Sequence, residues 1–145
     1  MNPHLSELIR YAESLLHIPY IYGGNYPRPG LDCSGLACNI LRTVGVVGLR
    51  EDLSAYGLYE KLSKRYGVLN GNPLPGSWMF YGKDGKINHV AFVVSPYSVI
   101  EAGAGDSTTT TVAVADKNGA CVRKVSIHHR VDLVACVLPK YPWDT

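Results

Sequence analysis

The sequence predicts an α+β domain in which N-terminal helices pack on a C-terminal antiparallel sheet. Apolar residues recur at helical intervals as far as Tyr66. Runs of β-branched and aromatic residues, separated by turn signals, fill the chain from Leu74 onwards. Helices that precede strands in this way are typical of α+β proteins. The 145 residues match the usual size of one domain, and no repeat or linker divides them, so residues 1–145 are expected to form a single domain.

Three helices are predicted in the first part of the chain. The first is capped by Asn2 or Ser6 and ends before Pro19, because proline cannot continue a helix. The second runs from about residue 33 to 44, with apolar residues four positions apart on its inner face. The third runs from about residue 54 to 66, and Gly67 is its stop signal.

The second part of the chain is predicted to form strands. Gly and Pro residues separate the apolar runs, and the turn-rich stretch 82–86 favours a hairpin. A further turn at Ser95-Pro96 joins two of the runs, and others are expected at 116–119 and 129–130. The strand candidates are residues 74–81, 88–94, 97–102, 112–115, 121–127 and 131–138.

Composition narrows the class of function. The net charge of +2 is too small to indicate a nucleic-acid partner. No apolar run reaches the roughly 18 residues that a membrane-spanning helix needs. Residues 1–10 lack the basic start and apolar core of a secretory signal, which favours synthesis in the cytoplasm without classical export.

The four cysteines do not have the spacing of a zinc site, since there is no Cys-x-x-Cys pair and no histidine at ligand spacing from a cysteine. Cys121 and Cys136 lie among β-branched residues and are interpreted as buried strand positions. No metal and no cofactor is expected. Cys33 differs from the others because Asp32 and Ser34, both good capping residues, place it at a helix N-terminus. Backbone N–H groups and the helix dipole favour a thiolate there.

A cysteine nucleophile needs a base, and His89 is the best candidate among the five histidines. It begins a β-rich run directly after the predicted hairpin, although a structural strand-end histidine is the alternative. His4 and His17 flank the first helix, where surface or capping roles suffice. The adjacent pair His128 and His129 is expected to be exposed at a strand end.

The base in turn needs an orienting group, and Glu101 is the candidate. If residues 88–94 and 98–102 pair as a hairpin, His89 and Glu101 become near neighbours. The Glu101 carboxylate could then accept the second imidazole N–H and fix the tautomer of the ring. The alternative is an exposed strand glutamate.

These segments together resemble the NlpC-type cell-wall cysteine peptidases, the NlpC and p-sixty family of the papain-like group. Members carry a Pro-Tyr-x-(Trp/Tyr)-Gly-Gly segment, an Asp-Cys-Ser-Gly box at a helix start, a Pro-Gly turn, a His-Val strand and a strand with a third polar residue. The resemblance covers residues from about 5 to 138. The matching segments occur in family order at residues 19–24, 32–35, 74–76, 89–92 and 99–102.

The resemblance implies that Cys33 is the nucleophile, His89 the base and Glu101 the orienting residue. Relatives often have histidine at the position of Glu101, and many have aspartate at the position of Ser77. Since glutamate can orient an imidazole, Glu101 is interpreted as a change that tunes the base and not as a loss of activity. Ser77 is interpreted as a change that affects only a turn.

The resemblance also implies a substrate site. Tyr20, Asp32 and Ser34 are expected to line it, because the equivalent residues of relatives contact the free amino end of a short wall peptide. The backbone N–H of Cys33 and the Tyr20 hydroxyl are candidates for oxyanion stabilisation.

The resulting expectation is a monomeric peptidoglycan hydrolase that cleaves stem peptides, with a scissile bond after D-glutamate implied by the resemblance. A phage or prophage lysin or a tail-associated enzyme is favoured, which would act on the wall after lysis, phage delivery or non-classical export. Alternatives are a delivered antibacterial effector amidase, a thiol acyltransferase or amidase for another small amide, and a non-catalytic wall-binding or tail component of the same fold.

Overall fold

The computed structural model describes residues 1–66, 68–69 and 73–144. It contains the three predicted N-terminal helices: α1 (Pro3–Ser14), α2 (Cys33–Arg42) and α3 (Ala55–Tyr66). The Asn2 side chain caps α1 by accepting the His4 backbone N–H at 2.8 Å, as predicted. Gly67, the predicted stop signal of α3, lies outside the described residues.

A six-stranded sheet forms the second layer. Its strands pair in the order β3–β8–β4–β5–β6–β7, and every neighbouring pair is antiparallel. A small separate hairpin, β1 (Asn25–Tyr26) with β2 (Gly30–Leu31), precedes α2. The strands of the large sheet are β3 (Val68–Leu69), β4 (Trp78–Lys83), β5 (Lys86–Ser95), β6 (Ser98–Gly103), β7 (Cys121–Ser126) and β8 (Leu133–Val137).

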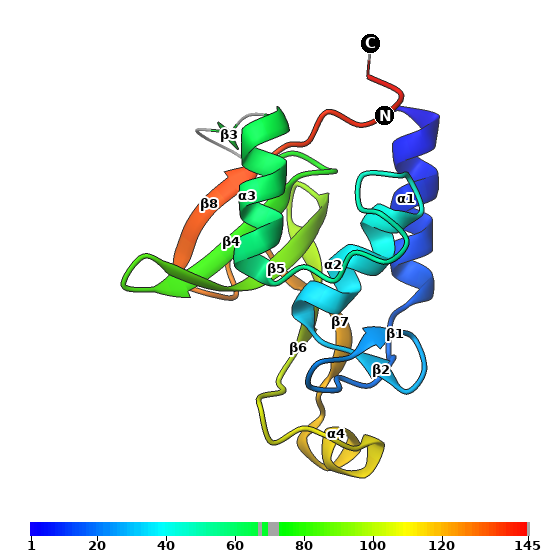
Figure 1. The fold of residues 1–145 in the computed structure, drawn as a ribbon, viewed down its shortest axis with the longest axis vertical. Helices are drawn as coiled ribbons and strands as arrows, with labels where there is room; N and C mark the ends of the chain where they lie inside the picture. The colour runs from blue at the N-terminus through cyan, green and yellow to red at the C-terminus, as the bar shows by residue number, and fades with distance from the viewer. Residues whose placement is uncertain (67, 70–72, 145) are drawn as a thin grey trace.

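The main core lies between the helices and one face of this sheet. Figure 1 shows α2 and α3 lying across the strands, with α1 beside α2. Leu36 and Ile40 of α2 are buried as their four-residue spacing predicts. They share this core with aromatic residues of the sheet, in which Trp78 and Phe92 stack with ring centroids 4.5 Å apart.

The opposite face of the sheet has its own buried cluster. Side chains alternate between the faces along each strand, so Met79 and Tyr81 point away from the helices while Trp78 and Phe80 point towards them. The second cluster is made of Met79, Tyr81, Ala91, Val93, Val99, Ile127 and Cys136. Cys136 is therefore buried as predicted, whereas Cys121 is only half-buried.

The prediction of a strand at 112–115 is wrong, because these residues begin α4 (Val112–Asn118). The Thr111 hydroxyl caps this helix by accepting the Val114 N–H at 3.2 Å. Gly119 ends it in the left-handed region at φ 65°, so the predicted turn at 116–119 is the last helical turn and its cap. Ala115, fully buried, fixes α4 to the core.

Within the described part of the chain, no helix has both the length and the apolar character needed to cross a membrane.

Candidate active site

The approach to α2 is built from close backbone contacts. Asp32 caps the helix: its Oδ1 accepts the Gly35 N–H at 2.6 Å and its Oδ2 accepts the Gly23 N–H at 3.1 Å. A Cβ on Gly35 would clash with the Gly24 carbonyl, so the turn and the helix start can meet only with glycine at position 35. The contact of Gly35 with the Gly-Gly turn and the cap by Asp32 therefore fix the position of Cys33, which lies between Asp32 and Gly35 in the chain.

Cys33 is the first residue of α2, as predicted, and it is half-buried. Its Sγ lies 3.8 Å from the carbonyl oxygen of Asn88, the residue before His89. Burial, followed by the nearby Asp32 carboxylate, raises the pKa of Cys33 to about 11, although backbone N–H groups oppose this. Burial therefore opposes the thiolate expected at this helix N-terminus and favours the thiol in the resting site, which then needs a base.

The second component is a histidine–carboxylate pair. Strands β5 and β6 form the predicted hairpin, with Phe92 opposite Ile100. This register puts His89 diagonal to Glu101 on one face of the sheet, and His89 Nε2 lies 2.7 Å from Glu101 Oε1. The contact leaves Nδ1 as the ring nitrogen that can accept a proton. The alternative of an exposed strand glutamate is wrong, because Glu101 is 1% exposed.

The Glu101 carboxylate has two further partners, which the sequence reasoning did not identify. Arg123, its register partner on β7, donates from Nε to Oε2 at 3.0 Å, and its Nη2 forms an ion pair with the same oxygen at 2.8 Å. His129 Nε2 lies 2.7 Å from Oε1. Burial acts to raise the pKa of Glu101, but hydrogen bonds and charge from His89, Arg123 and His129 outweigh it and lower that pKa to about 2.

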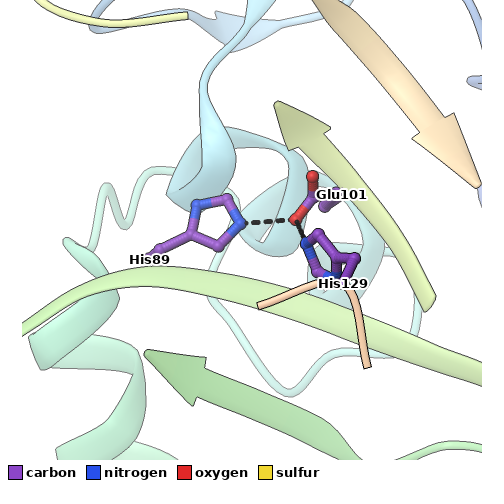
Figure 2. A group of neighbouring side chains, drawn as sticks. All are labelled: His89, Glu101 and His129. Atoms are coloured by element: carbon purple, nitrogen blue, oxygen red, sulfur yellow. Dashed lines mark hydrogen bonds and ion pairs between the residues drawn. The ribbon is translucent and has the colours of Figure 1, made fainter. Parts of the chain in front are cut away.

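The expectation that His128 and His129 are both exposed is half wrong. His128 is exposed, but His129 turns inwards, with a side chain 14% exposed. Figure 2 shows the rings of His89 and His129 converging on Glu101, each with a nitrogen directed at the same carboxylate oxygen. No sequence signal distinguishes the two adjacent histidines, since the backbone of the turn after β7 decides which one points inwards.

Cys33, His89 and Glu101 line one pocket of about 420 Å³. Tyr20 lines it as well, and Gly105 packs so closely on the Tyr20 ring that a Cβ there would clash with it. Burial, then the neighbouring Cys33, Asp32 and Asp106, raises the pKa of the Tyr20 hydroxyl well above its usual value, so it stays a proton donor. Residues of the pocket that the sequence did not indicate include Tyr22, Asp106, Arg123 and Arg130.

Asp32 and Ser34, expected in the substrate site, lie next to Cys33 but are engaged locally. The Ser34 hydroxyl donates to Asp32 Oδ1 at 3.2 Å, and the Asp32 carboxylate holds two backbone N–H groups. Neither residue is part of the pocket lining given by the structure. A direct contact between these two side chains and a substrate therefore stays a prediction.

Within residues 1–66, 68–69 and 73–144, one group has three metal-ligand atoms within 4.8 Å of one another: His89, Glu101 and His129. Glu101 Oε1 already accepts from both imidazoles. The guanidinium groups of Arg123 and Arg130 add two positive charges beside it. This environment disfavours a dication, and the group is a hydrogen-bonded network.

The protein has the papain-like α+β arrangement, in which a cysteine at a helix start and a histidine–carboxylate pair on an antiparallel sheet share a pocket. The chain belongs to the NlpC/P60 family, whose model matches residues 17–131.

Solved structures have the same fold. An NlpC/P60 family protein from Bacillus cereus matches with a TM-score of 0.69 and 19% identity, over 96% of this chain and 42% of that one. The NlpC/p60 domain of the peptidoglycan hydrolase SagA matches with a TM-score of 0.64 and 20% identity, over 94% of this chain and 98% of that one. The peptidoglycan hydrolase RipB from Mycobacterium tuberculosis matches with a TM-score of 0.66 and 20% identity, over 92% and 63% of the two chains.

A curated relative is the gamma-DL-glutamyl hydrolase of Bacillus subtilis, which is 25% identical over 105 residues. The match includes 70% of this chain but only 24% of the relative, so this chain corresponds to about a quarter of that protein's length.

Proposed function

We propose that this protein is a thiol hydrolase that cleaves amide bonds in the stem peptides of bacterial peptidoglycan. The observation that carries the proposal is the arrangement of Cys33 and the His89–Glu101 pair around one pocket. A thiol, a base with a free ring nitrogen and a carboxylate that orients the base are the parts that nucleophilic acyl transfer needs. Membership of the NlpC/P60 family adds support.

The proposed reaction begins with His89 neutral. Its Nδ1 takes the Cys33 proton as Sγ attacks the substrate carbonyl, since a thiol with a pKa of about 11 is a poor nucleophile without a base. The backbone N–H of Cys33 and the Tyr20 hydroxyl stabilise the oxyanion. His89 then gives its proton to the leaving amine, the C–N bond breaks and a thioester remains. Water, deprotonated by His89, hydrolyses the thioester and restores the Cys33 thiol.

The pocket's charges fit a short peptide that has both signs. Asp106 lies in the pocket lining, and so do Arg123 and Arg130. Such a lining suits a ligand with a free amine and free carboxylates, which stem peptides carry. SagA and RipB are peptidoglycan hydrolases, which supports the same substrate class. We place the scissile bond after D-glutamate.

A second candidate function is hydrolysis of γ-glutamyl bonds in peptides that are not part of the wall. It is favoured by the similarity to the gamma-DL-glutamyl hydrolase of Bacillus subtilis. Both candidates share the same thiol chemistry and differ only in substrate.

The proposal extends to the setting of the reaction: a phage or prophage lysin or tail-associated enzyme, with a delivered antibacterial effector as the alternative. Residues 3–14 form α1, whose Leu8, Ile9 and Ala12 are buried in the core, so this segment is part of the fold. Holin genes beside the encoding gene would indicate lysis, and tail genes would indicate injection.

The test is digestion of purified peptidoglycan, and separately of a soluble γ-glutamyl oligomer, with mass spectrometry to detect new amino termini. We expect new termini from peptidoglycan with the wild-type chain and none with Cys33→Ala. The matched control is Cys121→Ala, at a half-buried cysteine outside the pocket. Cleavage of the oligomer alone would favour the second candidate. Release of termini by Cys33→Ala at the wild-type rate would refute both.

A further inference from the structure

His129 is the residue of this site that the proposed reaction leaves without a role. It comes from the turn after β7, where its backbone N–H bonds to the Ser126 carbonyl at 3.0 Å. Its ring and that of His89 converge on one oxygen of Glu101 from different directions (Figure 2). Because Tyr81 lies against both rings, with centroids 5.6 Å from His89 and 5.9 Å from His129, neither ring can move freely.

The hydrogen bonds of the His129 ring determine its protonation. Nδ1 lies 3.0 Å from the Ser126 carbonyl oxygen, which can only accept. Nε2 lies 2.7 Å from Glu101 Oε1, and a carboxylate ionised at neutral pH can also only accept. Both ring nitrogens therefore need a proton to be satisfied, and this state is the imidazolium cation.

His89 differs from His129 in this respect. Its Nε2 donates to the same Glu101 oxygen, but its Nδ1 is left to the pocket that contains Cys33. The carboxylate has a partner on each oxygen: Oε1 accepts from two imidazoles, and Oε2 accepts from Arg123 Nε and forms an ion pair with Arg123 Nη2. These contacts hold it in one orientation.

The charges around the carboxylate also matter for His89. An ionised carboxylate beside an imidazole favours the imidazolium, which could not act as a base. The charged side chains near Glu101 and its two imidazoles are Arg123, Arg130 and Asp132, and the last two form a bidentate ion pair. With His129 protonated, Glu101 is compensated by two cations, Arg123 and His129, and attracts a proton to His89 less strongly.

We propose that His129 is a cationic positioning residue: its doubly protonated ring, anchored on Ser126, clamps the Glu101 carboxylate against His89 and keeps His89 neutral for the Cys33 thiol. This role rests on the proposed function, but its charge state does not, and the two can be tested separately. His129 itself touches neither the thiol nor the substrate carbonyl in this scheme.

The first test is ¹⁵N NMR of the histidine rings in the wild-type chain, which needs no substrate and no variant. We expect both nitrogens of His129 to carry protons at pH 7, while His89 is neutral with its proton on Nε2. A neutral His129 at pH 7 would overturn the proposal, whatever the protein hydrolyses.

The second test follows the His89 ring by the same method in two variants. In His129→Gln a donor remains but the charge is lost, so the pH at which His89 takes up a second proton should rise by about one unit. In His129→Lys a cation remains, and most of this change should disappear. The control is His128→Gln at the exposed neighbour, which should leave His89 unchanged. Equal behaviour of the Gln and Lys variants would refute a role that acts through charge.

A third measurement applies the variants to peptidoglycan. The acid side of the pH–rate profile should move upwards by about one unit in His129→Gln, with little change in KM. A uniform loss of rate at every pH would indicate a structural role only and would contradict the proposal. If no chain cleaves peptidoglycan, the proposed function fails while the two NMR tests still decide the state of His129.

Discussion

Replacing Glu101 by glutamine changes the charge of the most buried part of the site while keeping its shape. The pKa of Glu101 falls from 4.5 to about 2 on folding, which is a difference of roughly 2.5 units. At about 1.36 kcal/mol per unit, ionised Glu101 contributes on the order of 3 kcal/mol to the free energy of unfolding. Because the side chain is 1% exposed, little of this is lost to solvent screening.

The sign of the pH dependence follows from the lowered pKa. The contribution is complete above the unfolded-state pKa of 4.5 and disappears as the pH falls towards 2. Glu101→Gln has no such contribution and also turns an amide N–H towards donors of Arg123 or His129. We therefore expect the variant to be less stable by about 3 kcal/mol at pH 7, and the difference to shrink by about 1.4 kcal/mol per pH unit below pH 4.5.

Urea denaturation of both chains between pH 7 and pH 2.5 measures this difference directly. A typical domain of this size is stable by about 5–15 kcal/mol, so the variant should still fold at neutral pH. The matched control is Glu7→Gln, at an exposed glutamate paired with Arg10, which should change stability by less than about 0.5 kcal/mol. A Glu101→Gln difference that stays constant from pH 6 to pH 2.5 would mean that ionised Glu101 does not stabilise the folded state.

Two further predictions concern the same site. A Cβ at Gly103 would clash with Glu101 Oε2 and lie 2.7 Å from Arg123 Nε. Gly103→Ala should therefore separate this ion pair and lower the free energy of unfolding, measured by urea denaturation, by about 1–3 kcal/mol. Gly57→Ala, where the nearest atom is 3.4 Å away, is the control and should leave that free energy nearly unchanged. Because burial raises the pKa of Cys33 to about 11, its alkylation by iodoacetamide should accelerate nearly tenfold per pH unit between about pH 8 and pH 10. A fast, pH-independent reaction at pH 6–7 would instead reveal a preformed thiolate.

The sequence predicted the parts of this fold that local patterns control. The helix that starts at Cys33 follows from a capping aspartate and an apolar stripe, and the structure confirms both. The strand predicted at 112–115 failed because Val112 and Val114 have β propensity, while the deciding features are the Thr111 cap, the Gly119 stop and the burial of Ala115. Tertiary packing overrode local propensity there.

In the site, too, the features set by local patterns could be predicted and those set by long-range packing could not. The pairing of His89 with Glu101 could be predicted because a hairpin turn sets the register of its two strands. The contact between Arg123 and Glu101 could not be predicted, because it depends on the register of a third strand, β7, with β6. That register follows from long-range packing across a loop and α4. The contribution of His129 depends on the backbone of one turn, which residue types alone do not determine.

The proposed orienting role of Glu101 accounts for the presence of Arg123 and His129 beside it. A carboxylate that is 1% exposed needs compensating charge, because burying an unpaired anion is strongly unfavourable. His89 cannot supply that charge and still act as a base, since a base must be neutral before it takes the proton of Cys33. In the scheme that we propose, Arg123 and a protonated His129 supply it from outside the reacting pair. In this scheme Glu101, Arg123 and His129 therefore form one electrostatic unit, in which the carboxylate orients His89 and leaves it neutral only while both cations are in place.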